Sequence, residues 1–227
     1  MISRPSWNRD KEEWTVTASV VNAAWNSIIL GLTPDGSPPR KGSPQHITAD
    51  ACATSLAAKR EFDPRAVDVS SLLGEDAWAV LVERGRAAAT ARFEHYGRNV
   101  ADVDEDVLTI VRSPALLDHL APTGTRLSGD VEATFLYYKN GEGLPLHLDN
   151  DSTYEYNLLF CIEKSFVDVN ARPSATYFYL GDGAVKAAVL EPGRGVWFHA
   201  GYTPHARMPL LRESEITLFS LGMRRDG

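Results

Sequence analysis

Three side chains have the types and spacing of a metal site. His147 and Asp149 stand two residues apart, so in an extended segment both point to the same side. His205 follows much later, just after the segment 195–199, which we expect to be a strand. Two imidazoles and one carboxylate hold non-haem iron(II) on one face and leave positions open for dioxygen and a bidentate co-substrate. The spacing therefore predicts an iron(II) site at His147, Asp149 and His205.

A bare His-x-Asp pair occurs by chance in many chains, so its surroundings decide how it is interpreted. The pair lies at the end of an expected strand, and enough strands follow to form a barrel before His205. The alternative is that Asp149 caps a turn in the run Asp149-Asn150-Asp151, with both histidines ordinary surface residues. The repeated position at strand ends favours the metal site.

The pattern of the chain changes near residue 125. Before it, apolar residues recur at helical spacing, which predicts helices over 10–30, 48–59, 70–96 and 105–120. After it, short apolar runs between Gly, Pro and Asn turns predict strands over 131–139, 154–162, 174–180, 186–190, 195–199 and 215–221. We expect an α+β fold with a jelly-roll barrel and N-terminal helices packed outside. A single domain would span 1–227, with 1–125 mainly a helical elaboration and 126–227 the β-barrel core carrying the metal site.

Composition limits the partners. The 227 residues carry a net charge of −7, and the Lys and Arg residues are scattered, so nucleic acid is not an expected partner. No apolar run is long enough for a membrane span and no secretory signal is visible, which predicts a cytoplasmic protein without membrane association. Cys52 and Cys161 are expected to be reduced, buried residues. The oligomeric state is not indicated.

Two segments resemble a known family. YKNGEGLPLHLDN at 138–150 is similar to the metal-binding strand of the prolyl-hydroxylase-like branch of the iron(II)/2-oxoglutarate-dependent oxygenases. PGRGVWFHAGYTPHARMP at 192–209 resembles the segment around the distal histidine of that branch. The resemblance covers about 130–222 and implies a double-stranded β-helix, which is a jelly-roll or cupin-like barrel. It also implies that His147, Asp149 and His205 bind Fe(II), and that 2-oxoglutarate and dioxygen are consumed.

The resemblance further implies the type of reaction. Relatives that halogenate their substrates replace the metal-binding carboxylate with Gly or Ala, whereas this chain has Asp149. We therefore expect a hydroxylase, or a desaturase or cyclase. A compact chain without an added recognition module suggests a small-molecule substrate, such as an amino acid or a natural-product intermediate, although the branch also includes enzymes that act on peptides.

The distal carboxylate of 2-oxoglutarate needs a cation, preferably the fork of an arginine. Relatives usually carry it on the strand after the distal histidine, but the corresponding positions 214–216 hold no cation. Arg212 is the nearest candidate. Arg207 is the next, because in an extended segment it would point to the same side as His205. Lys164 and Arg224 are further alternatives.

Hydroxyl and amide groups are expected to assist that cation. Tyr138, Thr217 or Tyr137 could hold the same carboxylate. Asn157 alternates with Leu159 and Cys161, so it could face the barrel interior and bind the co-substrate or a ligand water.

The absence of a cation at the usual position leaves two alternatives to this function. One is a barrel iron oxygenase that does not use 2-oxoglutarate and whose substrate itself chelates the metal. The other is a non-enzymatic jelly roll that binds a sugar or another small ligand.

Overall fold

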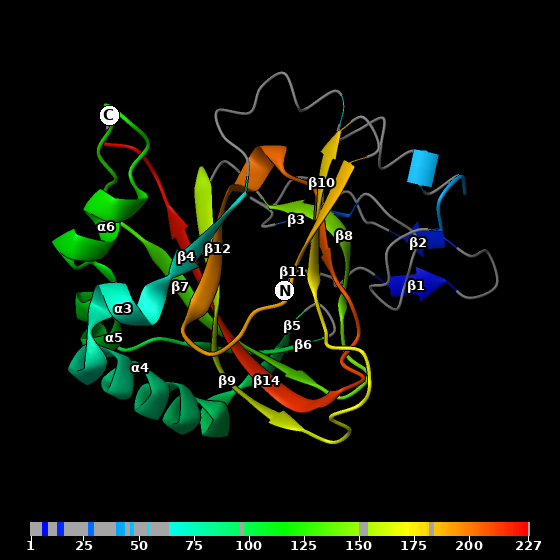
Figure 1. Ribbon diagram of the computed structural model, residues 1–227, viewed down its shortest axis with the longest axis horizontal. Helices are drawn as coiled ribbons and strands as arrows, with labels where there is room; N and C mark the ends of the chain where they lie inside the picture. The colour runs from blue at the N-terminus through cyan, green and yellow to red at the C-terminus, as the bar shows by residue number, and fades with distance from the viewer. Residues whose placement is uncertain are drawn as a thin grey trace.

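The structure is a computed structural model that describes residues 6–8, 13–15, 27–29, 40–43, 46–47, 54, 64–95, 98–149, 154–181 and 184–226. Its centre is a pair of antiparallel sheets that face each other (Figure 1). The larger sheet contains, in spatial order, β4 (Arg65–Asp68), β12 (Arg194–His199), β9 (Tyr156–Phe166), β14 (Glu213–Met223), β7 (Glu132–Lys139), β6 (Arg98–Asp102) and β5 (Phe93–His95). The smaller sheet contains β11 (Ala184–Ala188), β10 (Thr176–Gly181), β13 (His205–Arg207), β8 (Leu144–Asp149) and β3 (Ser27–Ile29).

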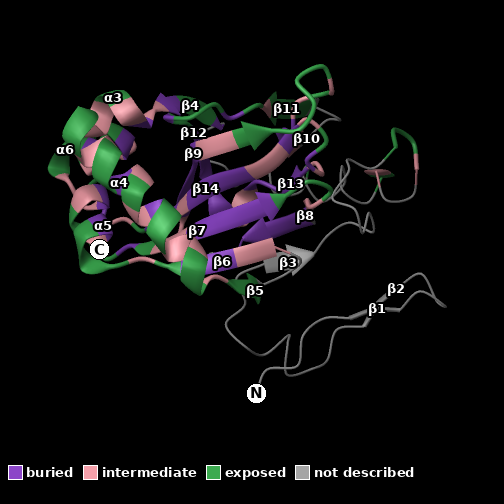
Figure 2. Ribbon diagram, turned by 90° about the horizontal axis from the view of Figure 1, so that it is seen from below, coloured by how far each residue is buried: buried purple, intermediate pink, exposed green. Residues whose placement is uncertain are grey.

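The helices cover the outer face of the larger sheet. They are α3 (Val69–Leu73), α4 (Glu75–Ala88), α5 (Glu105–Val111) and α6 (Pro114–Leu120), with 3-10 turns η1 (Ala89–Ala91) and η2 (Ala200–Tyr202). Leu81, Val107 and Leu116 from these helices share one core with Phe135 and Phe219 of the sheet. Figures 1 and 2 show the helices on one side of this sheet and the smaller sheet on the other. The expected α+β barrel with helices packed outside is confirmed.

Strand alternation gives the larger sheet two apolar faces. On β14, Phe219 and Leu221 belong to the core under the helices, whereas Leu218 belongs to the core between the sheets. Leu218 lies opposite Leu136 of β7, which in turn lies opposite Val100 of β6, and all three share the inner core. Successive strand residues point to opposite faces, so one strand contributes to both cores.

Two of the expected helices are interrupted. Gly74, at a φ of 81°, separates α3 from α4, because only glycine adopts that backbone conformation without strain. The helix expected over 70–96 therefore consists of α3, α4 and η1, and its last residues form β5. The helix expected over 105–120 is split before Pro114, which lacks a backbone N–H and begins α6 instead.

The prediction for the N-terminal half was partly wrong. Within the helix expected over 10–30, the described residues form β2 (Glu13–Thr15), which pairs with β1 (Ser6–Asn8), and β3. The helix expected over 48–59 lies outside the described residues except for Thr54, which is helical. β4, β5 and β6 also come from this half and join the larger sheet, so it is more than a helical elaboration. These strands are short and have too few residues for a clear alternating pattern.

The strands expected after residue 130 are confirmed, with shifts at their ends. β9 and β14 are longer than expected and run through the middle of the larger sheet. None of the described helices has the length and the apolar character needed to cross a membrane.

Candidate metal centre and its cavity

The three candidate ligands come from two neighbouring strands of the smaller sheet. His147 and Asp149 lie on β8, and His205 begins β13. The two strands are antiparallel, with His205 directly opposite His147. Asp149 is two residues from His147, so its side chain lies on the same face of β8. The pairing of β8 with β13 therefore brings together residues that are distant in sequence.

The ligand atoms converge on one point. One ligand atom from each of His147, Asp149 and His205 lies within 4.8 Å of the others. Asp149 Oδ1 is 3.5 Å from His147 Nε2 and 3.8 Å from His205 Nε2. All three side chains are buried. Two imidazole nitrogens and one carboxylate oxygen are the donor set of a non-haem iron(II) site, so the residues present fit such an ion.

Hydrogen bonds hold two of the ligands in the orientation that metal binding requires. His205 Nδ1 donates to the backbone oxygen of Thr203 at 3.0 Å, which leaves Nε2 free to bind an ion. Asn157 Nδ2 donates to Asp149 Oδ2 at 3.1 Å, and Ser220 Oγ donates to Asn157 Oδ1 at 3.1 Å. Asp149 Oδ1 therefore remains directed at the imidazoles.

Burial and neighbouring charges favour the protonation states that bind a cation. Burial, followed by the charge of His147, lowers the pKa of His205 to about 4, so its ring is neutral near pH 7. Burial alone would raise the pKa of Asp149, but His205, His147 and the hydrogen bond from Asn157 outweigh it and lower that pKa. A neutral imidazole and an ionised carboxylate are the forms that ligate a divalent ion.

The triad lines a cavity of about 210 Å³ between the two sheets. Its walls come from β6, β7, β9 and β14 of the larger sheet and from β8, β10 and β13 of the smaller one. Tyr138 and Asn157, two of the residues expected at the co-substrate site, also line it. Asn157 differs from the expectation in one respect, because its amide is bound to the metal ligand Asp149.

Arg207 is a buried cation in this cavity. It lines the same space as the triad and is only 2 % exposed. Its Nη1 donates to Thr176 Oγ1 at 3.1 Å, while Nε and Nη2 have no hydrogen-bond partner among the residues that the structure describes. Its guanidinium carbon lies 5.3 Å from the centroid of the Tyr138 ring. Burial lowers the pKa of Arg207 because it desolvates the charge, and the nearby Tyr138, Cys161 and buried Glu213 oppose this effect.

The other candidate cations lie away from the cavity. The Arg212 guanidinium stacks 5.1 Å from the centroid of Phe166. Lys164 Nζ is 2.6 Å from Glu191 Oε2. Neither these two nor Arg224 lines the cavity.

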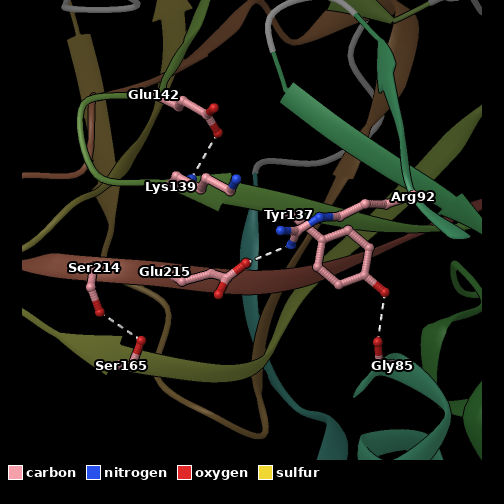
Figure 3. Close-up of polar contacts among 8 residues, drawn as sticks. All are labelled: Gly85, Arg92, Tyr137, Lys139, Glu142, Ser165, Ser214 and Glu215. Atoms are coloured by element: carbon pink, nitrogen blue, oxygen red, sulfur yellow. Dashed lines mark hydrogen bonds and ion pairs between the residues drawn. The ribbon is translucent and has the colours of Figure 1, made fainter. Parts of the chain in front are cut away.

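Ser214 and Glu215, which follow the buried Glu213 near the start of β14, contact residues outside the cavity. Glu215 accepts a hydrogen bond from Arg92 at 2.7 Å, and Ser214 is 2.7 Å from Ser165 (Figure 3). Thr217 lies opposite Tyr137, whose hydroxyl donates to the backbone oxygen of Gly85 on α4 at 2.6 Å. Thr217 and Tyr137 therefore belong to the face covered by helices, away from the expected co-substrate site.

Several residues that line the cavity were not predicted from the sequence. Tyr154 is buried, and burial, with Asp149 and Glu132 adding to it, raises its pKa well above the usual value, so its hydroxyl stays protonated. Thr176 and Ser220 could have been found from strand alternation. Arg98, Asp102 and Glu132, which also line the cavity, could not, because β6 was not recognised and Glu132 stands at the very end of a strand.

No protein-family model and no curated protein matches the sequence. Solved structures do match its fold. A prolyl-4-hydroxylase from Pseudomonas putida is 19% identical, with a TM-score of 0.54 over 77% of this chain and 98% of that one. A 2OG-Fe(II) oxygenase family oxidoreductase from Burkholderia pseudomallei is 9% identical, with a TM-score of 0.59 over 82% and 93%. An alpha-ketoglutarate-dependent epimerase from nogalamycin biosynthesis is 15% identical, with a TM-score of 0.54 over 76% and 82%. The chain thus has the double-stranded β-helix fold of these oxygenases.

Proposed function

We propose that the protein is an iron(II)- and 2-oxoglutarate-dependent oxygenase that acts on a small molecule. The observation that carries the proposal is the presence, in one cavity, of the buried His147–Asp149–His205 triad and the buried cation Arg207. The triad alone fits an iron oxygenase whatever co-substrate the enzyme uses. Arg207 adds a site for an anion beside it, which favours 2-oxoglutarate over a substrate that chelates the metal by itself.

Each residue has a defined part in this proposal. A bound iron would supply the oxidising chemistry with dioxygen and 2-oxoglutarate. His147, Asp149 and His205 hold it through one face, and Asn157 keeps Asp149 oriented. Arg207 binds the distal carboxylate of 2-oxoglutarate through Nε and Nη2, while Thr176 fixes the guanidinium from the other side.

Geometry along β13 supports this role for Arg207. Residues two apart on a strand are separated by roughly 6–7 Å, which is comparable to the length of a five-carbon diacid. His205 and Arg207 stand two apart and both line the cavity. One end of 2-oxoglutarate would thus lie at the metal and the other at the guanidinium.

The expected outcome is hydroxylation, with desaturation or cyclisation as alternatives. Asp149 fills the ligand position that would otherwise be open to a halide, and its hydrogen bond from Asn157 fixes it there. The modest volume of the cavity, about 210 Å³, favours a small substrate over a folded protein or a long peptide.

The test is anaerobic addition of iron(II) and then 2-oxoglutarate, with visible absorption recorded. Bidentate binding of the keto acid to iron(II) should produce a charge-transfer band, and His147→Ala or Asp149→Ala should abolish it together with tight iron binding. Iron binding without a band would contradict the use of 2-oxoglutarate and favour the alternative iron oxygenase. Absence of divalent-metal binding would instead favour a ligand-binding jelly roll.

A further inference from the structure

The cavity has a second charged region besides the metal centre and Arg207. Arg98 and Asp102 line it from β6, and Glu132 lines it from the start of β7. β6 and β7 are antiparallel neighbours, with Asp102 opposite Thr134. Glu132 is two residues from Thr134, so it lies on the same face and next to Asp102. One cation and two carboxylates thus line one wall.

The cation and the acids lie at opposite ends of this wall. Arg98 approaches Tyr138, with its guanidinium carbon 6.0 Å from the ring centroid, near the end that also holds Arg207. Arg98 and Asp102 are four residues apart on one strand face, a separation of roughly 13 Å. This is the separation of their Cα atoms, and no ion pair joins Arg98 to Asp102 or Glu132 among the described residues.

Arg98 has no counterion among the residues that the structure describes. Its Nε is buried and has no hydrogen-bond partner among the described residues, and it forms no ion pair with any of them. Arg92, which precedes the β5–β6 hairpin, is paired with Glu215 outside the barrel. At the other end, burial raises the pKa of Glu132, with Arg224 opposing and Asp130 adding to the effect. Asp102 and Glu132 are exposed residues that line the cavity, so both ends of the wall are open to a ligand of opposite charge.

The charges set the kind of molecule that fits. With iron(II) and 2-oxoglutarate bound, their charges cancel against those of Asp149 and Arg207. Arg98, Asp102 and Glu132 then leave one net negative charge. A free basic amino acid carries one net positive charge. It measures on the order of 7–9 Å from carboxylate to side-chain cation by standard bond lengths. With a charge-assisted hydrogen bond of about 2.8 Å at each end, such a molecule is long enough to reach along this wall from Arg98 towards Asp102 and Glu132.

We propose that the primary substrate is a free basic amino acid, whose carboxylate is bound by Arg98 and whose side-chain cation is bound by Asp102 and Glu132. This inference rests on the proposed function, because it assigns the substrate of the same site. The carbon chain of the bound amino acid then lies along the cavity that the candidate metal ligands also line.

Calorimetric titration of the anaerobic protein, loaded with iron(II) and 2-oxoglutarate, tests the inference without turnover. The probes are L-arginine and L-lysine, with L-norleucine, which lacks the side-chain cation, and agmatine, which lacks the carboxylate. At least one basic amino acid should bind. The two truncated probes should bind roughly 10- to 100-fold more weakly, since each loses a charge-assisted hydrogen bond.

Variants of the protein test which residue binds each end of the basic amino acid. Arg98→Gln should weaken binding of the basic amino acid by roughly 10- to 100-fold but leave agmatine binding unchanged, and Arg98→Lys should retain part of the affinity. Glu132→Gln should weaken binding of the basic amino acid and leave binding of L-norleucine unchanged. Arg86→Gln and Glu83→Gln, which change exposed residues of α4, are the matched controls and should behave as the parent protein.

The outcomes separate this inference from the proposed function. If the charge-transfer band forms but neither basic amino acid binds, the substrate assignment is overturned and the oxygenase proposal stands. If Arg98→Gln weakens 2-oxoglutarate binding and leaves the amino acid unaffected, Arg98 belongs to the co-substrate site and the inference also fails. If no band forms in the parent protein, the proposed function itself falls. Thermal unfolding of each variant confirms that it remains folded.

Discussion

The two oxygens of the Asp149 carboxylate have different surroundings. Oδ2 accepts a hydrogen bond from Asn157, and Oδ1 lies within 3.8 Å of both imidazoles. The amide of Asn157 is itself fixed by Ser220, on the neighbouring strand β14. Because this relay fixes one oxygen, the other stays directed at the two imidazoles, where an ion would bind.

Replacing Asn157 tests this relay. Asn157→Leu keeps the size of the side chain but removes the donor to Asp149, so affinity for iron(II) or manganese(II) should fall by about 10- to 100-fold. Competition with a fluorescent chelator measures the affinity. Asn170→Leu, in an exposed loop, is the control, and an unchanged affinity in Asn157→Leu would contradict the relay.

Arg207 is expected to affect co-substrate binding without stabilising the fold. In Arg207→Gln, affinity for 2-oxoglutarate should fall roughly 10- to 100-fold, because one charge-assisted pair is lost. Thermal stability should stay equal or rise, since a buried, incompletely paired charge is removed. Titration of the charge-transfer band measures the first effect. Arg212→Gln, whose side chain stacks on Phe166, should leave the band unchanged; equal losses in both variants would refute the assignment.

Strand alternation correctly predicted that His147 lies beside Asp149 and that His205 and Arg207 line one cavity. His147 and Asp149 share a face, and Arg207 follows His205 at the same interval, so local spacing sufficed for both strands. Arg212 was expected at the cavity but instead stacks on Phe166, next to the irregular pairing at the start of β14. Arg98 was not predicted to line the cavity for another reason. Its position depends on the pairing of β6 with β7, which no local sequence pattern indicates.

At the scale of elements, close packing between β12 and β9 limits which residues are tolerated. A Cβ at Gly195 would lie 2.7 Å from Phe160 Cβ and 3.1 Å from the backbone oxygen of Leu159. Both neighbours belong to the central strand β9, so neither can move away without disturbing the sheet. The glycine therefore allows two strands and their side chains to approach closely.

Gly195→Ala should destabilise the protein by about 1–3 kcal/mol, since the added methyl group overpacks this contact. Gly129→Ala is the matched control, because a Cβ there meets nothing within 4 Å. Urea unfolding of both variants measures the difference. Equal stability would show that β12 and β9 can separate without cost.

The elements themselves were predictable to different degrees. Long strands such as β9 and β14 have continuous apolar patterns and were found. The breaks at Gly74 and Pro114 were missed because apolar spacing continues across them, although both residue types are known to interrupt helices. Short edge strands such as β4 gain their stability from the sheet that they join, so their own sequence carries little signal.

At the scale of the whole molecule, the buried triad should make the metal-free protein sensitive to acid. Histidine ordinarily has a pKa of 6.5, whereas that of His205 is lowered to about 4. Between these values the unfolded chain binds a proton that the folded protein does not. The free energy of unfolding should therefore be highest above pH 6.5 and fall towards pH 4, by up to about 3 kcal/mol.

Chemical denaturation of chelator-treated protein at a series of pH values measures this slope. His205→Gln removes the titrating group, so the variant should lose less stability over the same range. Acid-sensitive groups remote from the triad are common to both proteins and cancel in the comparison, whereas Asp149, whose pKa is lowered by His205, adds to the difference in the same direction. An identical slope in the variant would mean that His205 is already protonated in the folded state.

The hairpin of β5 and β6 lies at the edge of the larger sheet, whereas the candidate metal ligands and Arg207 lie on β8 and β13 of the smaller sheet. In the proposed function, Arg98 and Asp102 on this hairpin therefore lie apart in sequence from the candidate metal ligands, while Glu132 joins them from β7. We expect mutations at Arg98 and Asp102 to change which compound binds while the candidate metal ligands stay in place. This short segment is the natural place to diversify when a library of new specificities is built on this scaffold.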